Sequence, residues 1–160
     1  MITVSKADLS SATHAAAVVH LLNTYAQDPM GGQQALSDFV KTNLIAELQK
    51  RSGAHIILAF DDEMPVGLAI CFEGFSTFAC KPLLNIHDIV VHPAARRQGL
   101  ARRLLAQAEE IANALGCCKL TLEVLEGNTP AQAVYRSCGF EGYALNPETG
   151  KALFWQKPLP

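Results

Sequence analysis

The chain has 160 residues, of which 49% are apolar and 18% charged, so it can bury a core and is not an intrinsically disordered chain. Fifteen acidic against thirteen basic residues leave a net charge of −2, which argues against non-specific binding to nucleic-acid phosphates. Residues 1–10 do not resemble a signal peptide, and no apolar run approaches the roughly 20 residues of a membrane helix. We expect a single cytoplasmic domain over residues 1–160 without nucleic-acid or membrane partners, and homodimer formation stays open.

The first third of the chain predicts one short strand and two helices. Residues 2–5 predict the strand, and residues 10–27 predict a helix that ends at the proline and glycines of residues 28–32. An apolar residue recurs every four positions from Leu36 to Leu48, which predicts the second helix.

The middle of the chain predicts a hairpin and a buried strand. Residues 54–60 and 66–72 predict two antiparallel strands, followed by a longer loop over residues 73–82. Residues 86–91 predict a strand whose end is apolar on both faces, as in a central strand that is covered on two sides.

The second half of the chain predicts a parallel crossover. A helical apolar stripe over residues 100–115 separates the strand at 86–91 from another at 120–125, and such a unit is right-handed. A short helix from Pro130 and two strands around residues 146–150 complete the prediction. We therefore expect an α/β (α+β) fold with a mixed sheet.

The segment from Pro93 to Arg103 concentrates positive charge at the start of a predicted helix. Its arginines are Arg96, Arg97, Arg102 and Arg103. The helix dipole makes each such cation unfavourable by about 0.3 to 1 kcal/mol, so an anionic partner is expected to offset it. Exposed N–H groups, a glycine and arginines together suit a phosphate or pyrophosphate. Charge alone is explained equally well by a solvated basic patch that faces the glutamates of the same helix.

Sequence motifs narrow the choice of phosphate ligand. The chain contains neither a Gly-x-x-x-x-Gly-Lys-Ser/Thr loop nor a Gly-x-Gly-x-x-Gly motif after a strand, which argues against nucleotide hydrolysis and dinucleotide chemistry. Residues 96–101, Arg-Arg-Gln-Gly-Leu-Ala, resemble instead the Arg/Gln-x-x-Gly-x-Gly/Ala signature of the GNAT superfamily of acetyl-CoA-dependent N-acetyltransferases. Residues 88–93, Asp-Ile-Val-Val-His-Pro, are similar to the end of the strand that precedes this signature in the family.

The resemblance continues downstream. Residues 122–128, Leu-Glu-Val-Leu-Glu-Gly-Asn, look like the fifth strand of the family and the asparagine that follows it. Matches to the family pattern Ala-x-x-x-Tyr-x-x-x-Gly-Phe are Ala131, Tyr135, Gly139 and Phe140. The close match covers residues 85–140.

The resemblance implies a mixed, mostly antiparallel sheet of about seven strands with about four helices, splayed between the fourth and fifth strands. The pantetheine arm of acetyl-CoA is then expected in this opening, paired with the backbone near Ile89 and Val91, and the pyrophosphate on the N–H groups of Gln98 to Arg102. Ala101 replaces a common glycine, which the signature allows. The expected cofactor-binding residues are Ile89, Val90, Val91, Arg96, Arg97, Gln98, Gly99, Leu100, Ala101, Arg102, Asn128, Ala131 and Tyr135.

Tyr135 lies on the apolar stripe of the helix predicted from Pro130, where Thr129 is expected to cap the helix with Gln132 reaching back. Its periodicity alone is typical of a core tyrosine. The resemblance implies another role, that of the general acid that protonates the CoA thiolate as it leaves.

His87 and Asp88 place polar groups in an otherwise apolar strand. Alternation along a regular strand puts residues 85, 87, 89 and 91 on one face and 86, 88, 90 and 92 on the other, so His87 and His92 cannot bind one metal ion and no metal is expected. His87 and Asp88 can both be ordinary polar groups at the solvated end of the strand.

Amide formation gives His87 and Asp88 a second interpretation, because a protonated amine must lose a proton before it attacks a thioester. The families that this chain resembles take the base from this strand, as a carboxylate in spermidine/spermine acetyltransferases and as histidine in the serotonin N-acetyltransferase-like group. His87 matches the second group, although Asn85 stands where that group has another histidine. His87 is the expected base and Asp88 the second candidate, with direct transfer or a water relay left open.

We therefore expect an N-acetyltransferase that moves the acetyl group of acetyl-CoA to a primary amine without a covalent enzyme intermediate. The alternative is a noncatalytic module of the same fold that binds CoA or a partner for regulation. Retention of Tyr135 and Asn128 favours the enzyme. The acceptor amine and the acyl-donor range stay open at this point.

Overall fold

Long apolar strands from the middle of the chain form the centre of the sheet. In the computed structural model, which describes residues 1–160, β2 (Ala54–Asp61) and β3 (Met64–Ser76) form an antiparallel hairpin. β1 (Ile2–Lys6) pairs antiparallel with β2, and β4 (Lys81–Val91) pairs antiparallel with β3. β5 (Leu120–Leu122) lies parallel to β4, so the sheet is mixed, with the order β1-β2-β3-β4-β5.

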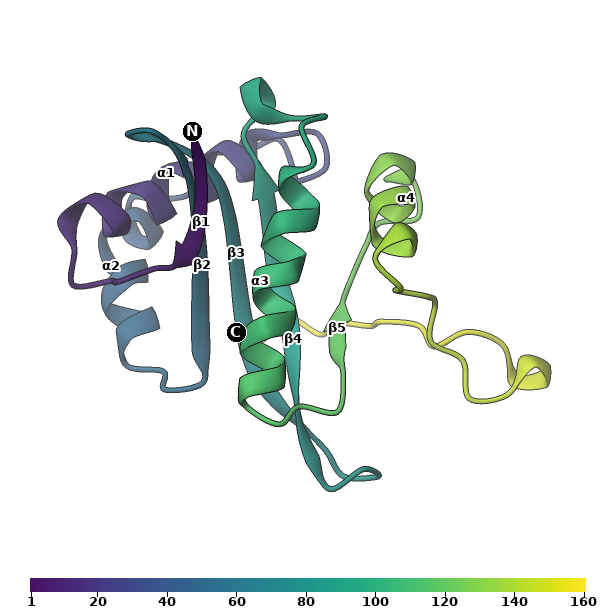
Figure 1. The fold of residues 1–160 in the computed structure, drawn as a ribbon. Helices are drawn as coiled ribbons and strands as arrows, with labels where there is room; N and C mark the ends of the chain where they lie inside the picture. The colour runs from purple at the N-terminus through teal and green to yellow at the C-terminus, as the bar shows by residue number, and fades with distance from the viewer.

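Helices cover both faces of the sheet, as Figure 1 shows. α1 (Ala12–Gln27) and α2 (Asp38–Gln49) pack on one face, and α3 (Leu100–Ala114) packs on the other. α4 (Thr129–Ser137) follows β5 at the edge of the molecule. None of these helices combines the length and apolar composition that crossing a lipid bilayer requires.

Two separate cores result from the alternation of side chains along the strands. Leu58 belongs to the core beneath α1 and α2, which we call the α1-side core, whereas its neighbour Ile57 belongs to the core beneath α3, which we call the α3-side core. The apolar stripe of α3 is buried through Leu100, Leu104 and Ala108. The predicted strand, helix and parallel strand of the crossover are all present.

The sheet splays between β4 and β5, as predicted. The two strands pair only from Leu84 opposite Leu120 to Ile86 opposite Leu122. β4 then continues to Val91, while the chain after β5 turns away toward α4 (Figure 1). The last part of β4 is therefore without a neighbouring strand on this side.

The sheet has five strands, so the prediction of about seven was wrong. The two strands predicted around residues 146–150 are absent, because residues 141–160 are exposed and contain only a 3₁₀ turn at Pro147–Thr149. β5 is also shorter than the predicted 120–125. A three-residue strand offers too few unpaired backbone groups on its outer edge to hold a further hairpin.

The β3–β4 hairpin is longer than predicted. Most of residues 73–82, which were expected to form a loop, continue the two strands as a paired ribbon, and only residues 77–80 lie between them. Even Pro82 takes part, because it pairs opposite Phe75 on this ribbon, which extends the sheet.

Candidate functional site

A β-bulge at His87 interrupts the pairing of β4 with β3. Asp88 lies opposite Ile70 and Ile86 lies opposite Cys71, although Ile70 and Cys71 are consecutive. His87 is therefore the extra residue, without a partner on β3. Such an insertion locally increases twist and redirects the side chains that follow it.

The bulge changes which face each later residue of β4 occupies. Ile86 and Ile89 both contact the α3-side core, whereas Val90 is buried in the α1-side core. The strict alternation expected for residues 85–92 was therefore wrong, because one extra residue reverses the faces beyond it.

The same bulge places His87 and Asp88 side by side toward α1. Asp88 lies opposite Ile70, which belongs to the α1-side core, and cross-strand partners share a face. The ring of His87 meets the ring of Phe72 edge-on, with centroids 5.5 Å apart. Burial raises the pKa of Asp88 above its usual value, and the neighbouring His87 reduces this shift.

Two tyrosines approach the opening from opposite sides. Burial raises the pKa of Tyr25 at the end of α1, and the carboxylates of Asp88 and Asp28 raise it further. Tyr135 in α4 is 9% exposed and contacts the α3-side core. Burial raises its pKa to about 12, with a smaller contribution from Tyr25. Tyr25 at the end of α1 therefore lies near enough to Asp88 and Tyr135 to interact electrostatically with both.

Backbone groups of β4 line this opening. The N–H of His92 donates to the carbonyl of Val66 on β3. Because backbone groups of successive strand residues point to opposite edges, Ile89 and Val91 direct theirs away from β3, toward the side without a strand. Val90 directs its backbone toward β3 and its side chain, 5% exposed, into the α1-side core. Of the three β4 residues predicted to bind the cofactor, Ile89 and Val91 therefore present backbone groups there and Val90 does not.

The loop before α3 presents free N–H groups. It consists of a 3₁₀ turn at Pro93–Ala95 and of two residues with left-handed backbone, Arg97 (φ 64°) and Gly99 (φ 75°). Gly99 caps α3 without a side chain, and Arg103 is the first residue whose N–H donates to a carbonyl of the helix, that of Gly99. The N–H groups of residues 100–102 have no partner in the helix, and a Cβ at Gly99 would meet open space.

The arginines of this loop differ in what they contact. Arg96 donates from Nη2 to Oδ2 of Asp28 at 2.7 Å and from Nε to the carbonyl of Val91 at 3.3 Å. Arg97 and Arg102 are exposed and form no ion pair. Sequence reasoning did not find the partner of Arg96, because 68 residues separate the two positions.

The start of α4 differs in one detail from the prediction. Asn128, not Thr129, caps the helix, and its side-chain oxygen accepts from the N–H of Ala131 at 3.3 Å. Gln132 does not reach back to the cap but donates to the carbonyl of Leu125 at 3.0 Å. These bonds hold the chain between β5 and α4, and they leave the amide nitrogen of Asn128 for another partner.

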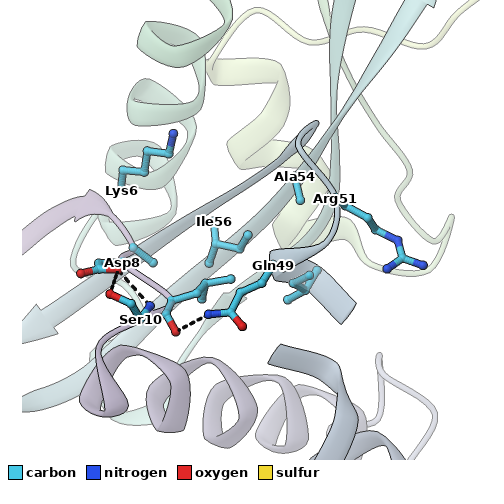
Figure 2. A pocket seen from close by; sticks show the side chains of 10 residues that line it. Lys6, Asp8, Ser10, Gln49, Arg51, Ala54 and Ile56 are labelled. Atoms are coloured by element: carbon cyan, nitrogen blue, oxygen red, sulfur yellow. Dashed lines mark hydrogen bonds between the residues drawn. The ribbon is translucent and has the colours of Figure 1, made fainter. Parts of the chain in front are cut away.

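Two surface hollows lie away from the opening. The larger, with a volume of about 320 Å³, lies between the β1–α1 loop and the end of α2 (Figure 2). Its polar groups bond to one another, Ser10 Oγ to Asp8 Oδ1 at 2.6 Å and Gln49 Nε2 to the carbonyl of Leu9 at 3.0 Å. The smaller hollow, of about 250 Å³, lies between α1 and the β2–β3 turn. Neither contains a residue of the predicted site.

Comparison with known proteins identifies the family. Residues 17–140 match the model of the Acetyltransferase (GNAT) family. The protein belongs to this family. Among curated relatives, thialysine N-epsilon-acetyltransferase of Caenorhabditis elegans is 33% identical over 86 residues, which cover 54% of this chain and 53% of that protein. Aminoglycoside N(6')-acetyltransferase type 1 of Acinetobacter haemolyticus is 29% identical over 106 residues, 64% of this chain and 69% of that protein.

A solved structure shares the fold of the whole chain. AAC(6')-Iy, in complex with the bisubstrate analog CoA-S-monomethyl-acetylneamine, matches with a TM-score of 0.76 at 20% identity, covering 99% of each chain. The GNAT fold is thereby confirmed. The match to the C. elegans relative, in contrast, spans only about half of that protein, 53% of its length.

Replacing Asp88 by asparagine should stabilise the fold at neutral pH. The folded state raises the pKa of Asp88, so the carboxyl favours folding below its unfolded pKa of about 3.9 and disfavours it as pH rises through the folded pKa. Asparagine imitates the protonated form. Urea denaturation of Asp88→Asn should show a gain in unfolding free energy at pH 7 that disappears near pH 3.5.

Glu63→Gln is a matched control, because Glu63 lies in the same β2–β3 turn with an exposed side chain that forms no ion pair or hydrogen bond. It should show no pH-dependent gain. Equal or lower stability of Asp88→Asn at pH 7 would contradict the burial of the Asp88 carboxylate.

Proposed function

We propose that this protein is an N-acetyltransferase that transfers the acetyl group of acetyl-CoA to a primary amine by direct attack. One observation carries the proposal. β4 and β5 separate beyond Ile86, which leaves the edge of β4 at Ile89 unpaired, and the bulge beside this edge carries His87 and Asp88 on the α1 side of the sheet. The CoA analog named for AAC(6')-Iy, which shares this fold, supports CoA as the donor.

The residues around the opening fit the chemical groups of acetyl-CoA. Amides of the pantetheine arm match the free backbone groups of Ile89 and the free N–H of Val91, whose carbonyl already accepts from Arg96. The pyrophosphate matches the N–H groups of residues 98–102, and Arg97 and Arg102 lie close by in sequence without acidic partners. Leu100 is 2% exposed and contributes its N–H alone. Asn128 and Ala131, at the start of α4, border the other side of the opening.

The base comes from the bulge. In the reaction, the nitrogen lone pair of the amine attacks the thioester carbonyl, the C–S bond breaks, and the amine proton passes to a base. Burial raises the pKa of Asp88 toward the range in which a carboxylate accepts protons at neutral pH. His87 is more exposed and reaches solvent directly. Three routes for the amine proton are to be distinguished: to Asp88 alone, to His87 alone, and through a water relay between them.

Tyr135 supplies the acid. A pKa of about 12 keeps its hydroxyl protonated throughout the physiological range. An alkyl thiol has a pKa of about 8.5, so full proton transfer from this phenol to a free thiolate is uphill by roughly 5 kcal/mol. The proton must therefore move while the C–S bond breaks, or the hydroxyl must stabilise the thiolate by hydrogen bonding.

The acceptor is an amine that carries positive charge in solution. The carboxylate of Asp88 raises the pKa of Tyr25 and has no arginine or lysine partner, whereas Asp28 is paired with Arg96, so Asp88 places negative charge where α1 borders the opening. Such a site attracts ammonium groups. The relatives are named for thialysine and for aminoglycosides, which are amine substrates of different size. An assay of free thiol released from acetyl-CoA across polyamines, amino acids and aminoglycosides tests the class.

Gly99→Asp should abolish CoA binding while Gly99→Asn weakens it less. Both side chains tolerate the left-handed backbone at φ 75°, and both enter the space in front of the first turn of α3. Only aspartate brings a negative charge to the pyrophosphate position. Isothermal calorimetry with CoA measures the difference. Equal affinities for the two folded variants would remove the phosphate site from this loop.

Tyr135→Phe should bind acetyl-CoA nearly as the wild type does while turnover falls. The ring and its packing stay, but the donor is lost, and loss of a general acid reduces rate by about 10² to 10⁴-fold. Tyr143→Phe, at an exposed tyrosine of the C-terminal segment, is the matched control. Full activity of Tyr135→Phe would leave Tyr135 as a core residue without a part in proton transfer, whereas absence of turnover by the wild type with every amine would favour a noncatalytic CoA-binding module.

The pH dependence of turnover should identify the base. His87→Ala or Asp88→Asn, whichever removes the base, should lose most activity at low pH and regain part of it as pH rises, because more acceptor amine is then already neutral. CoA affinity should be unchanged in both variants. If neither variant alters the pH profile of kcat/KM, the proton leaves through water without help from the bulge.

A further inference from the structure

Asp28 connects two loops that are distant in sequence. It ends α1, and its carbonyl accepts from the N–H of Gly31 at 2.8 Å and of Gln33 at 3.3 Å. Its carboxylate uses both oxygens, since Oδ1 accepts from the N–H of Met30 at 3.0 Å and Oδ2 accepts from Arg96 at 2.7 Å. One residue thus organises the turn after α1 and reaches the loop before α3.

Arg96 is held on two sides. Its Nη2 bonds to Asp28 while its Nε bonds to the carbonyl of Val91, so the planar guanidinium spans the turn after α1 and the end of β4. The carboxylate of Asp28 is 20% exposed, and its pKa is lowered chiefly by the hydrogen bond from Arg96. Arg96 is therefore already occupied by protein groups, unlike Arg97 and Arg102.

This ion pair is the only salt bridge between the α1–α2 region and the loop before α3. A stacked pair of rings lies nearby, His20 and His92, with centroids 6.4 Å apart. The turn itself is tightly fitted, because a Cβ at Gly31 would collide with the carbonyl of Tyr25. The turn that carries Asp28 is therefore closely packed against the end of α1.

We propose that Asp28 is a positioning residue for acetyl-CoA that acts through Arg96. By holding the guanidinium against the Val91 carbonyl, it fixes the backbone of residues 96–99 and so aligns the N–H groups at the start of α3. Arg96 then supports the backbone of the loop, and Arg97 and Arg102 supply the positive charge for the phosphates. This replaces the expectation that Arg96 itself binds phosphate, and it rests on the proposed function.

The direction in which Asp28→Asn changes CoA affinity shows whether Arg96 supports the loop or binds phosphate. If Arg96 supports the loop, Asp28→Asn loosens the loop and weakens CoA binding by about tenfold or more, as expected for the loss of a charge-assisted hydrogen bond. If Arg96 is a phosphate ligand that Asp28 restrains, the same substitution removes a negative charge, frees a cation and tightens CoA binding.

Isothermal calorimetry with CoA on the full chain provides the test. Asp28→Asn should weaken binding, and Asp28→Glu should restore part of it because a carboxylate is present again. Arg96→Lys should lose as much as Asp28→Asn, since one ammonium lacks the planar fork that reaches both Val91 and Asp28. The double variant Asp28→Asn/Arg96→Lys should lose no more than either single variant.

Glu110→Gln is the matched control for net charge, because it lies ten residues along α3, about 15 Å from the helix start. It should leave CoA affinity unchanged. In the acetyl-transfer assay, Asp28→Asn should raise the KM for acetyl-CoA while kcat stays within a few fold of the wild type, a split that general destabilisation would not produce.

Each outcome bears on a different statement. Unchanged or tighter CoA binding by folded Asp28→Asn, or full affinity of Arg96→Lys, overturns the positioning role while the proposed function stands. Absence of CoA binding by the wild type overturns the proposed function and this inference with it.

Discussion

β4 and β5 pair over three residues each and then separate, and the geometry of the site depends on this early end of the ladder. A longer ladder would satisfy the backbone of Ile89 and Val91 within the sheet. Because the ladder ends, these groups need a partner from outside the sheet. The same separation gives Tyr135 a place beside the sheet.

The bulge at His87 determines on which face of the sheet the polar side chains beside this opening lie. A regular β4 would send His87 and Asp88 to opposite faces, one of them toward the α3-side core. One inserted residue turns both toward α1 and still lets Ile89 pack beneath α3. The half-buried carboxylate of Asp88 raises the free energy of the folded state, and such a cost is typical of functional sites.

Local features of the sequence predicted much of this site, and non-local ones did not. The glycine at 99 and the helix stripe after it are encoded within a few residues, so the start of α3 was predicted correctly, and the binding role of the loop before it stays a prediction. The bulge is invisible in β4 alone, because it exists only relative to the register of β3. The Asp28–Arg96 pair depends on tertiary packing, and the two C-terminal strands were expected from residues whose pairing partner, β5, is too short.

The exposed C-terminal segment has a spectroscopic consequence. The single tryptophan of the chain, Trp155, lies there with 84% of its surface exposed, outside both cores. Its indole is surrounded by water in the folded protein much as it is in the unfolded chain. Intrinsic tryptophan emission therefore reports on residues 141–160 and not on the sheet, and the tyrosines Tyr25 and Tyr135 are the native chromophores that sense the environment of the opening.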